Sequence, residues 1–132
     1  IHRLELMADS GGAGKYRGGT GLRKDVELLA ESAVMTGLGD RHVNPPFGIF
    51  GGKPGALAHT ILNPNGNAQE LGSKEVVNLM KGDVVSFQLS GAGGYGDPAE
   101  RDPAKIKADL ADGYVTPDGA RNHYGYSSQE TD

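Results

Sequence analysis

Three glycine-rich stretches, residues 9–21, 48–55 and 91–96, carry most of the polar side chains that could do chemistry in this chain. Backbone N–H groups in such loops, together with a guanidinium or an ammonium group, can bind an anion. The candidates for substrate-binding or interface roles are Ser10, Gly11, Gly12, Arg17, Asp40, Arg41, Lys53 and Tyr95. Their spacing indicates no nucleophile–base pair, so the catalytic residues stay unassigned.

Two of the glycine stretches match nucleotide-binding motifs in part. Residues 91–96 have the spacing G-x-G-x-x-G, but Asp97-Pro98 follows where the dinucleotide motif requires a helix to begin. Residues 14–16, GKY, resemble the end of a phosphate-binding loop, but a tyrosine replaces its serine or threonine. We interpret both as structural loops, in which glycines 91, 93, 94 and 96 give the backbone access to positive φ.

Metal-binding and redox patterns are missing from the sequence. The four histidines are scattered, and no two of them have the helical spacing of metal ligands. The chain has no cysteine, which excludes a disulfide framework and thiolate ligands. We therefore predict no metal ligand in this chain. For Ser10, a hydrogen bond within a turn is the alternative to a catalytic role.

Composition limits the partners. The formal net charge is −4, and no run of Lys or Arg stands out, so nucleic acid and anionic membranes are excluded as partners. No apolar stretch approaches the roughly 20 residues that span a bilayer. We expect a cytoplasmic protein. Because the chain begins at Ile1 directly in a strand-like run, we also expect a fragment or a cleaved product of something longer.

The pattern of residues predicts an α+β fold, mainly β, with a pair of short helices at the end of the chain. Alternation of apolar and polar residues favours strands at residues 1–7, 22–29, 33–38 and 58–62. The first of these strands is expected to be half-buried, with its leucines on the covered face. Residues 76–80 and 83–89 are typical of a hairpin with its bend at 81–82. We predict a β-rich glycine-loop region (1–98), a helical pair packed on it (99–126) and a polar tail (127–132).

Capping residues predict the two helices. Asp102-Pro103 and Thr116-Pro117 are typical helix starts, and Gly113 and Gly125 are typical stops. Three apolar residues, Ile106, Leu110 and Val115, are expected to bury against the sheet.

Four stretches together resemble a known family: residues 9–20 (DSGGAGKYRGGT), 46–57 (PFGIFGGKPGAL), 89–104 (LSGAGGYGDPAERDPA) and 109–126 (DLADGYVTPDGARNHYGY). In this order and spacing they resemble the carboxyl-terminal part of the hydantoinase B/5-oxoprolinase family. That family includes the B subunits of N-methylhydantoinase and 5-oxoprolinase and a large subunit of acetone and acetophenone carboxylases.

The resemblance implies an ATP-dependent enzyme that opens a cyclic amide, such as hydantoin, 5-oxoproline or a lactam. It implies ATP with Mg on a partner A subunit, and a divalent metal in an amino-terminal part of the B subunit that this chain lacks. The partners implied are the A-type subunit and the rest of the B subunit, and the isolated chain is expected to be inactive.

Three other interpretations stay open beside this one. The first, within the same family, is a subunit of a ketone carboxylase. The second is a non-catalytic assembly module that binds the A subunit. The third is a small independent enzyme that uses Ser10 or Asp40.

Overall fold

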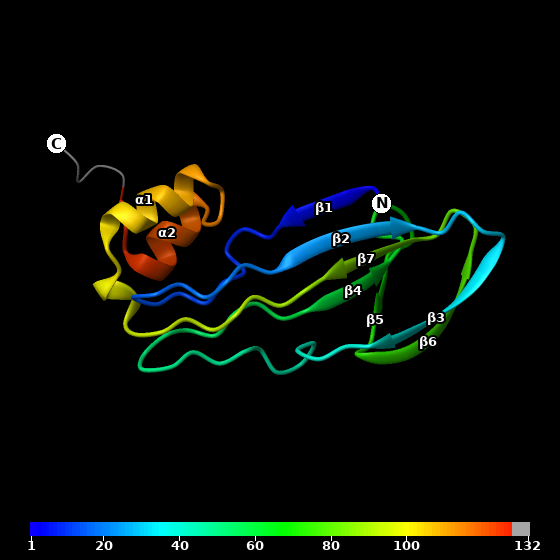
Figure 1. The fold of residues 1–132 in the computed structure, drawn as a ribbon, viewed down its shortest axis with the longest axis horizontal. Helices are drawn as coiled ribbons and strands as arrows, with labels where there is room; N and C mark the ends of the chain where they lie inside the picture. Colours follow the sequence, from blue (N-terminus) through cyan, green and yellow to red (C-terminus); the bar gives the residue numbers. More distant parts are fainter. Residues whose placement is uncertain (128–132) are drawn as a thin grey trace.

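The strands of the chain form two antiparallel sheets, and the computed structural model describes residues 1–127 (Figure 1). The larger sheet has the strand order β1-β2-β7-β4-β5, and the smaller is a two-stranded ribbon of β3 and β6. The strands are β1 (Arg3–Leu6), β2 (Leu22–Glu27), β3 (Ser32–Leu38), β4 (His59–Leu62), β5 (Gln69–Leu71), β6 (Lys74–Met80) and β7 (Val84–Gln88). The expected α+β class with a mainly β architecture is therefore confirmed.

The ribbon faces part of the larger sheet. Burial alternates along β3, as it does when a strand has one covered face. Leu79 of the ribbon is buried, as are Leu71 and Val85 of the larger sheet. A core therefore lies on the side of the sheet formed by β4, β5 and β7.

The ribbon leaves β1 uncovered, which corrects one expectation. Leu4 is 62% exposed and Leu6 is 52% exposed, so the predicted half-buried strand is exposed on both faces. The sequence pattern is that of a strand with one apolar face, but the cover for that face is not formed by residues 1–127.

The predicted hairpin of residues 76–80 and 83–89 is wrong. Both strands exist, and Gly82 at the bend has φ of 90°. However, β6 pairs with β3, while β7 pairs with β2 and β4 in the other sheet. Val85 and Ser86 of β7 are both buried, which suits a central strand, whereas β6 exposes alternate residues.

Two helices follow the sheets, α1 (Pro103–Ala111) and α2 (Pro117–Tyr124), after a short 3₁₀ turn, η1 (Pro98–Glu100). The Asp102 carboxylate accepts from the N–H of Ala104 at 2.9 Å, and the Thr116 hydroxyl accepts from the N–H of Gly119 at 3.0 Å. Gly125 ends α2 in the left-handed conformation. The predicted caps are therefore confirmed, because they depend on local geometry alone.

The helical pair does not pack against the sheet, contrary to expectation. Ile106, Val115 and Ala120 form a small core of their own, and Leu110 is only half-buried beside it. The helices lie at the opposite end of the molecule from the strands, and glycine-rich segments run between the two (Figure 1). No helix within residues 1–127 is long and apolar enough to cross a membrane.

The division into three regions at residues 98 and 126 stays a prediction. Of the predicted polar tail, residues 128–132 lie outside the described part of the chain.

Candidate functional site

Three extended segments, residues 10–19, 47–55 and 91–96, lie side by side between the sheet and the helices (Figure 1). Gly12 N donates to Ala92 O at 2.8 Å, and Gly94 N donates to Lys53 O at 2.9 Å. Lys53 N in turn donates to Ala13 O at 2.7 Å. We call these three hydrogen-bonded segments the glycine bundle. The three glycine-rich stretches therefore approach one another in space.

The glycines of the bundle are required mainly for close approach. A Cβ atom on Gly12, Gly52 or Gly94 would lie within 3.0 Å of a backbone atom of a neighbouring segment. Among glycines 91, 93, 94 and 96, φ is positive only at Gly96, where it is 74°. The proposed reason for these glycines, access to positive φ, is therefore wrong for the other three. Hydrogen-bonded backbones this close leave no room for side chains between them.

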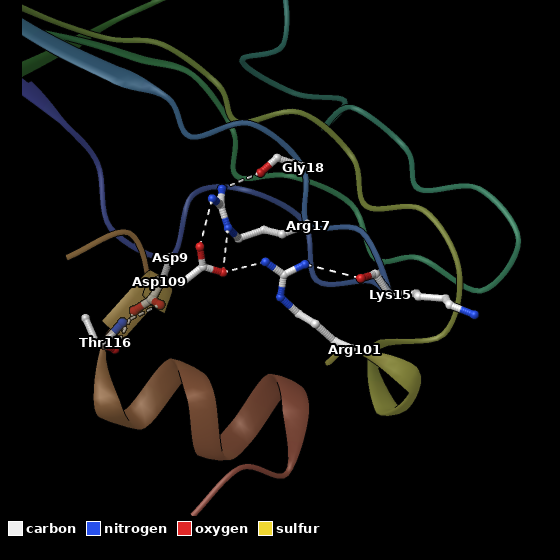
Figure 2. A network of polar contacts seen from close by, with 7 residues as sticks. All are labelled: Asp9, Lys15, Arg17, Gly18, Arg101, Asp109 and Thr116. Carbon is white, nitrogen blue, oxygen red and sulfur yellow. Dashed lines mark hydrogen bonds and ion pairs between the residues drawn. The ribbon is translucent and has the colours of Figure 1, made fainter. Parts of the chain in front are cut away.

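A buried carboxylate joins the glycine bundle to the helical pair (Figure 2). Asp109 of α1 accepts from Arg17 Nε at 3.1 Å and Nη2 at 3.2 Å, and from Arg101 Nη2 at 2.7 Å. Arg101 also donates to the carbonyl of Lys15, and Arg17 to that of Gly18. Asp109 and Arg101 are both buried. We call these three charged side chains the Asp109 cluster.

The arginines change the acidity of Asp109. Desolvation by burial raises the pKa of its carboxyl group, but hydrogen bonds from Arg17 and Arg101 and their positive charges lower it by more. The net result is a pKa below the usual value for aspartate, so Asp109 is an anion at neutral pH.

A second carboxylate reinforces the same joint. Asp9 has φ of 58°, and its side chain accepts from both the N–H and the hydroxyl of Thr116 at the start of α2 (Figure 2). A Cβ atom on Gly119 would collide with this carboxylate. The first glycine segment and the helical pair are thus held together by ion pairs and hydrogen bonds at two points.

An exposed row of side chains marks one side of the bundle. Tyr16 and Ile49 each form an isolated bridge with Tyr95, and bridged residues point to the same side. The Tyr16 and Tyr95 ring centroids are 6.1 Å apart, and Phe50 meets Tyr95 edge-on at 5.2 Å. Tyr95 is 49% exposed and Phe50 is 76% exposed. We call Tyr16, Ile49, Phe50 and Tyr95 the aromatic ridge.

The ridge is held rigidly at some cost in backbone energy. Tyr95 exchanges both of its backbone hydrogen bonds with Tyr16, and Ile49 accepts from the N–H of Gly96. Phe50 has φ of 52°, which is strained for a bulky side chain. Strain of this kind persists where the surroundings impose it and is common at functional sites. The ridge is therefore a candidate contact surface.

The predicted site residues do not form one site. Ser10 is buried, and its hydroxyl donates to Met7 O and accepts from Gly21 N, which agrees with the turn interpretation. Gly11 and Gly12 belong to the bundle, Arg17 to the Asp109 cluster and Tyr95 to the ridge. Lys53 lines a pocket of about 350 Å³ beside α2.

Asp40 and Arg41 lie apart from these residues, after β3, at a pocket of about 440 Å³. Sequence reasoning missed Arg101 and Asp109. One feature of the sequence could have indicated that Asp109 is buried. Asp109 follows the apolar Ile106 by three residues, which places both on the same face of α1.

The residues described offer no ligand set for the metal that the family resemblance implies. Within residues 1–127, no three or more His, Cys, Asp or Glu side chains are grouped so as to hold a metal ion. The loop that resembles a phosphate site is also engaged, since Lys15 pairs with Glu100 at 3.1 Å. We therefore derive no step through a metal or a nucleotide in this chain.

Residues 1–98 match the family model of hydantoinase B/oxoprolinase. The chain belongs to the hydantoinase B/oxoprolinase family. It is 37% identical over 132 residues to caprolactamase subunit beta of Pseudomonas jessenii, covering 95% of this chain and 22% of that protein. The family resemblance inferred from the four sequence stretches together is thus confirmed.

Solved structures show the same fold. The ATP-dependent caprolactamase of Pseudomonas jessenii superposes with a TM-score of 0.80 at 32% identity, over 99% of this chain and 24% of that one. A nucleotide-free acetone carboxylase also gives a TM-score of 0.80, at 23% identity, over 97% of this chain and 21% of that one. This hydantoinase B family chain thus spans about a quarter or less of the length of these relatives.

Proposed function

We propose that this chain is one region of an ATP-dependent enzyme that opens cyclic amides such as a lactam, hydantoin or 5-oxoproline. The observation that carries the proposal is the match to caprolactamase subunit beta along 95% of the chain, together with the shared fold of the solved ATP-dependent caprolactamase. ATP would be bound with Mg by an A-type partner, and a divalent metal by the part of a B-type subunit that this chain does not match.

The contacts in the chain support a structural contribution to such an enzyme. Ser10 and Arg17, two of the candidate site residues, are both engaged in internal hydrogen bonds. Asp109 is likewise committed to two arginines. Side chains that hold the fold in this way are not free to act on a substrate, so we expect the isolated chain to be inactive.

A second candidate function, an assembly module that binds the A-type subunit, is favoured by the aromatic ridge. Exposed tyrosine and phenylalanine side chains on a rigid backbone are typical of the residues that dominate binding energy at protein interfaces. The two candidates are compatible, since a region of the enzyme can also hold its partner. The likeness to acetone carboxylase supports the fold and adds nothing for ketone carboxylation.

The experiment is a reconstitution. The chain would be purified alone and also with the A-type and B-type polypeptides of its host, and ring opening of caprolactam, 5-oxoproline and hydantoin would be followed together with ADP release. We expect ring opening coupled to ADP release in the assembly, and none from the chain alone or without ATP. Turnover by the chain alone, or bicarbonate-dependent consumption of acetone in place of ring opening, would overturn the proposal.

A further inference from the structure

A cleft of about 280 Å³ opens between the β3–β6 ribbon and the larger sheet. Met35 of the ribbon and Leu71 and Phe87 of the sheet give it apolar walls. His42 and Thr60 add polar groups, with His42 Nε2 3.4 Å from Thr60 Oγ1. Pockets that bind small molecules have this mixture, an apolar lining with a few fixed polar groups.

The cleft continues into a more polar space. Asp40 and His42 line both the cleft and the neighbouring pocket of about 440 Å³, which Arg41 and Lys74 also line. Arg41 has φ of 68°, and its carbonyl accepts from the N–H of Ala58 at 2.9 Å. Backbone strain is common at functional sites, and Arg41 is strained where the cleft meets this pocket, which we call the mouth of the cleft. The mouth therefore carries one carboxylate and two cationic side chains.

A glycine inside a strand lies at the same place. Gly37 is in the interior of β3 and lines the cleft. A Cβ atom built on it would meet only Glu75 O, at 3.7 Å, which is an ordinary contact distance. Glycine weakens a strand and often marks a site where a ligand or another backbone comes close. Unlike at the bundle glycines, no backbone atom lies closer than 3.7 Å to a Cβ on Gly37, so a side chain could be accommodated there.

We propose that this cleft binds a small molecule with an apolar ring or short chain and one amide, or the amino acid formed when such a ring opens. The apolar part fits against Met35, Leu71 and Phe87, and the amide can exchange hydrogen bonds with Thr60 and His42. The charged ends of an opened ring fit Asp40, Arg41 and Lys74 at the mouth. This inference rests on the proposed function for its ligand class.

The test is a titration of the whole chain followed by ¹H–¹⁵N NMR, with caprolactam and 6-aminohexanoate as the probes and urea as an amide without an apolar part. We expect saturable shifts at Met35, Thr60 and Phe87 with the two probes, and none with urea. Absence of saturable shifts, or equal shifts with urea, would overturn the proposal.

A matched pair of variants localises the binding. Gly37→Leu should fill the cleft and lower the affinity for both probes by about tenfold or more, because the new side chain clashes with the ligand. Gly66→Leu adds the same side chain in an exposed turn, where nothing lies within 4 Å of the new Cβ, and should bind as the wild type does. Wild-type affinity in a folded Gly37→Leu chain would contradict the inference.

Arg41→Gly provides a second variant that does not alter the cleft wall. Glycine suits φ of 68°, so the backbone should be kept while the guanidinium is removed. We expect weaker binding of 6-aminohexanoate and unchanged binding of caprolactam. An unchanged affinity for 6-aminohexanoate would show that the charged residues at the mouth do not bind the ligand. None of these measurements requires ATP or a partner, so an inactive reconstituted assembly would contradict the proposed function and leave the cleft result standing.

Discussion

Among single residues, Asp109 determines how the two ends of the molecule are joined. Its carboxylate accepts from Arg17 and Arg101, and all three side chains are shielded from solvent. Arginine suits this role because its planar group donates two parallel hydrogen bonds to one carboxylate. A buried charge is tolerated only while its partners remain, so the cluster is sensitive to the loss of any member.

We predict that Asp109→Asn lowers the free energy of unfolding by about 3–5 kcal/mol, because it leaves two arginines near each other without their counter-charge. Urea unfolding measured by circular dichroism checks this. Asp112→Asn, at the exposed end of the same helix, is the control and should change stability by no more than about 0.5 kcal/mol. Equal effects of the two variants would show that the cluster adds nothing to stability.

The same carboxylate should make stability depend on pH. The folded state holds the pKa of Asp109 below its usual value, so its contribution is complete above the unfolded pKa of about 3.9 and is lost as pH falls through the folded pKa. We therefore expect the difference in unfolding free energy between the wild type and Asp109→Asn to shrink as pH falls below about 4. Denaturant unfolding across an acid pH series measures it, and a difference that stays constant would refute this assignment.

Among the elements, the glycine bundle connects the sheet to the helices without forming regular strands. Its three segments exchange backbone hydrogen bonds directly, and several glycines leave no space for a Cβ atom. The bundle is therefore stiff although its glycine content is high, because freedom in the unfolded chain does not imply freedom after packing. That stiffness fixes the aromatic ridge in place.

We expect Gly12→Ala to destabilise the chain by about 3 kcal/mol or more, since the new methyl group would overlap backbone atoms of both other segments. Gly19→Ala, where nothing lies within 4 Å of the new Cβ, should cost little and could even stabilise the chain by reducing the entropy of the unfolded state. Thermal unfolding of the two variants checks the contrast, and a tolerant Gly12 site would mean that the segments can separate.

For the whole molecule, the strands and the helices lie at opposite ends, and the bundle between them presents the aromatic ridge (Figure 1). Further apolar side chains are exposed on the outer face of the ribbon, where Val34 and Leu38 of β3 point away from the core. Exposed apolar groups on this scale are typical of surfaces that meet another protein.

We predict that the double change Phe50→Ser with Tyr95→Ser weakens co-purification of the chain with its A-type partner by about tenfold or more, as loss of aromatic anchors does at other interfaces. Fold stability should change little, because Phe50 is largely exposed and Tyr95 is about half exposed. Leu29→Ser with Val43→Ser, two exposed apolar residues outside the ridge, is the matched control. Equal binding by both double variants would exclude the ridge from the interface.

The sequence by itself determined those features of the protein that depend on residues close together in the chain. Several strands could be predicted because alternating apolar residues mark a strand with one covered face. The capped starts of α1 and α2 could be predicted because their hydrogen bonds join residues two or three positions apart. The family could also be inferred, because the glycine loops keep a characteristic order and spacing. One short strand, β5, has too few residues for alternation to reveal it.

Only the tertiary structure decided which distant segments meet. Asp109 and Arg17 are 92 positions apart, and nothing in the residues around either one indicates the other. β6 pairs with β3 and not with the adjacent β7, because burial of whole faces outweighs the short turn between them. The residues around Gly12, Gly52 and Gly94 do not reveal why glycine is required there, since the reason is a backbone atom of another segment that only folding brings close.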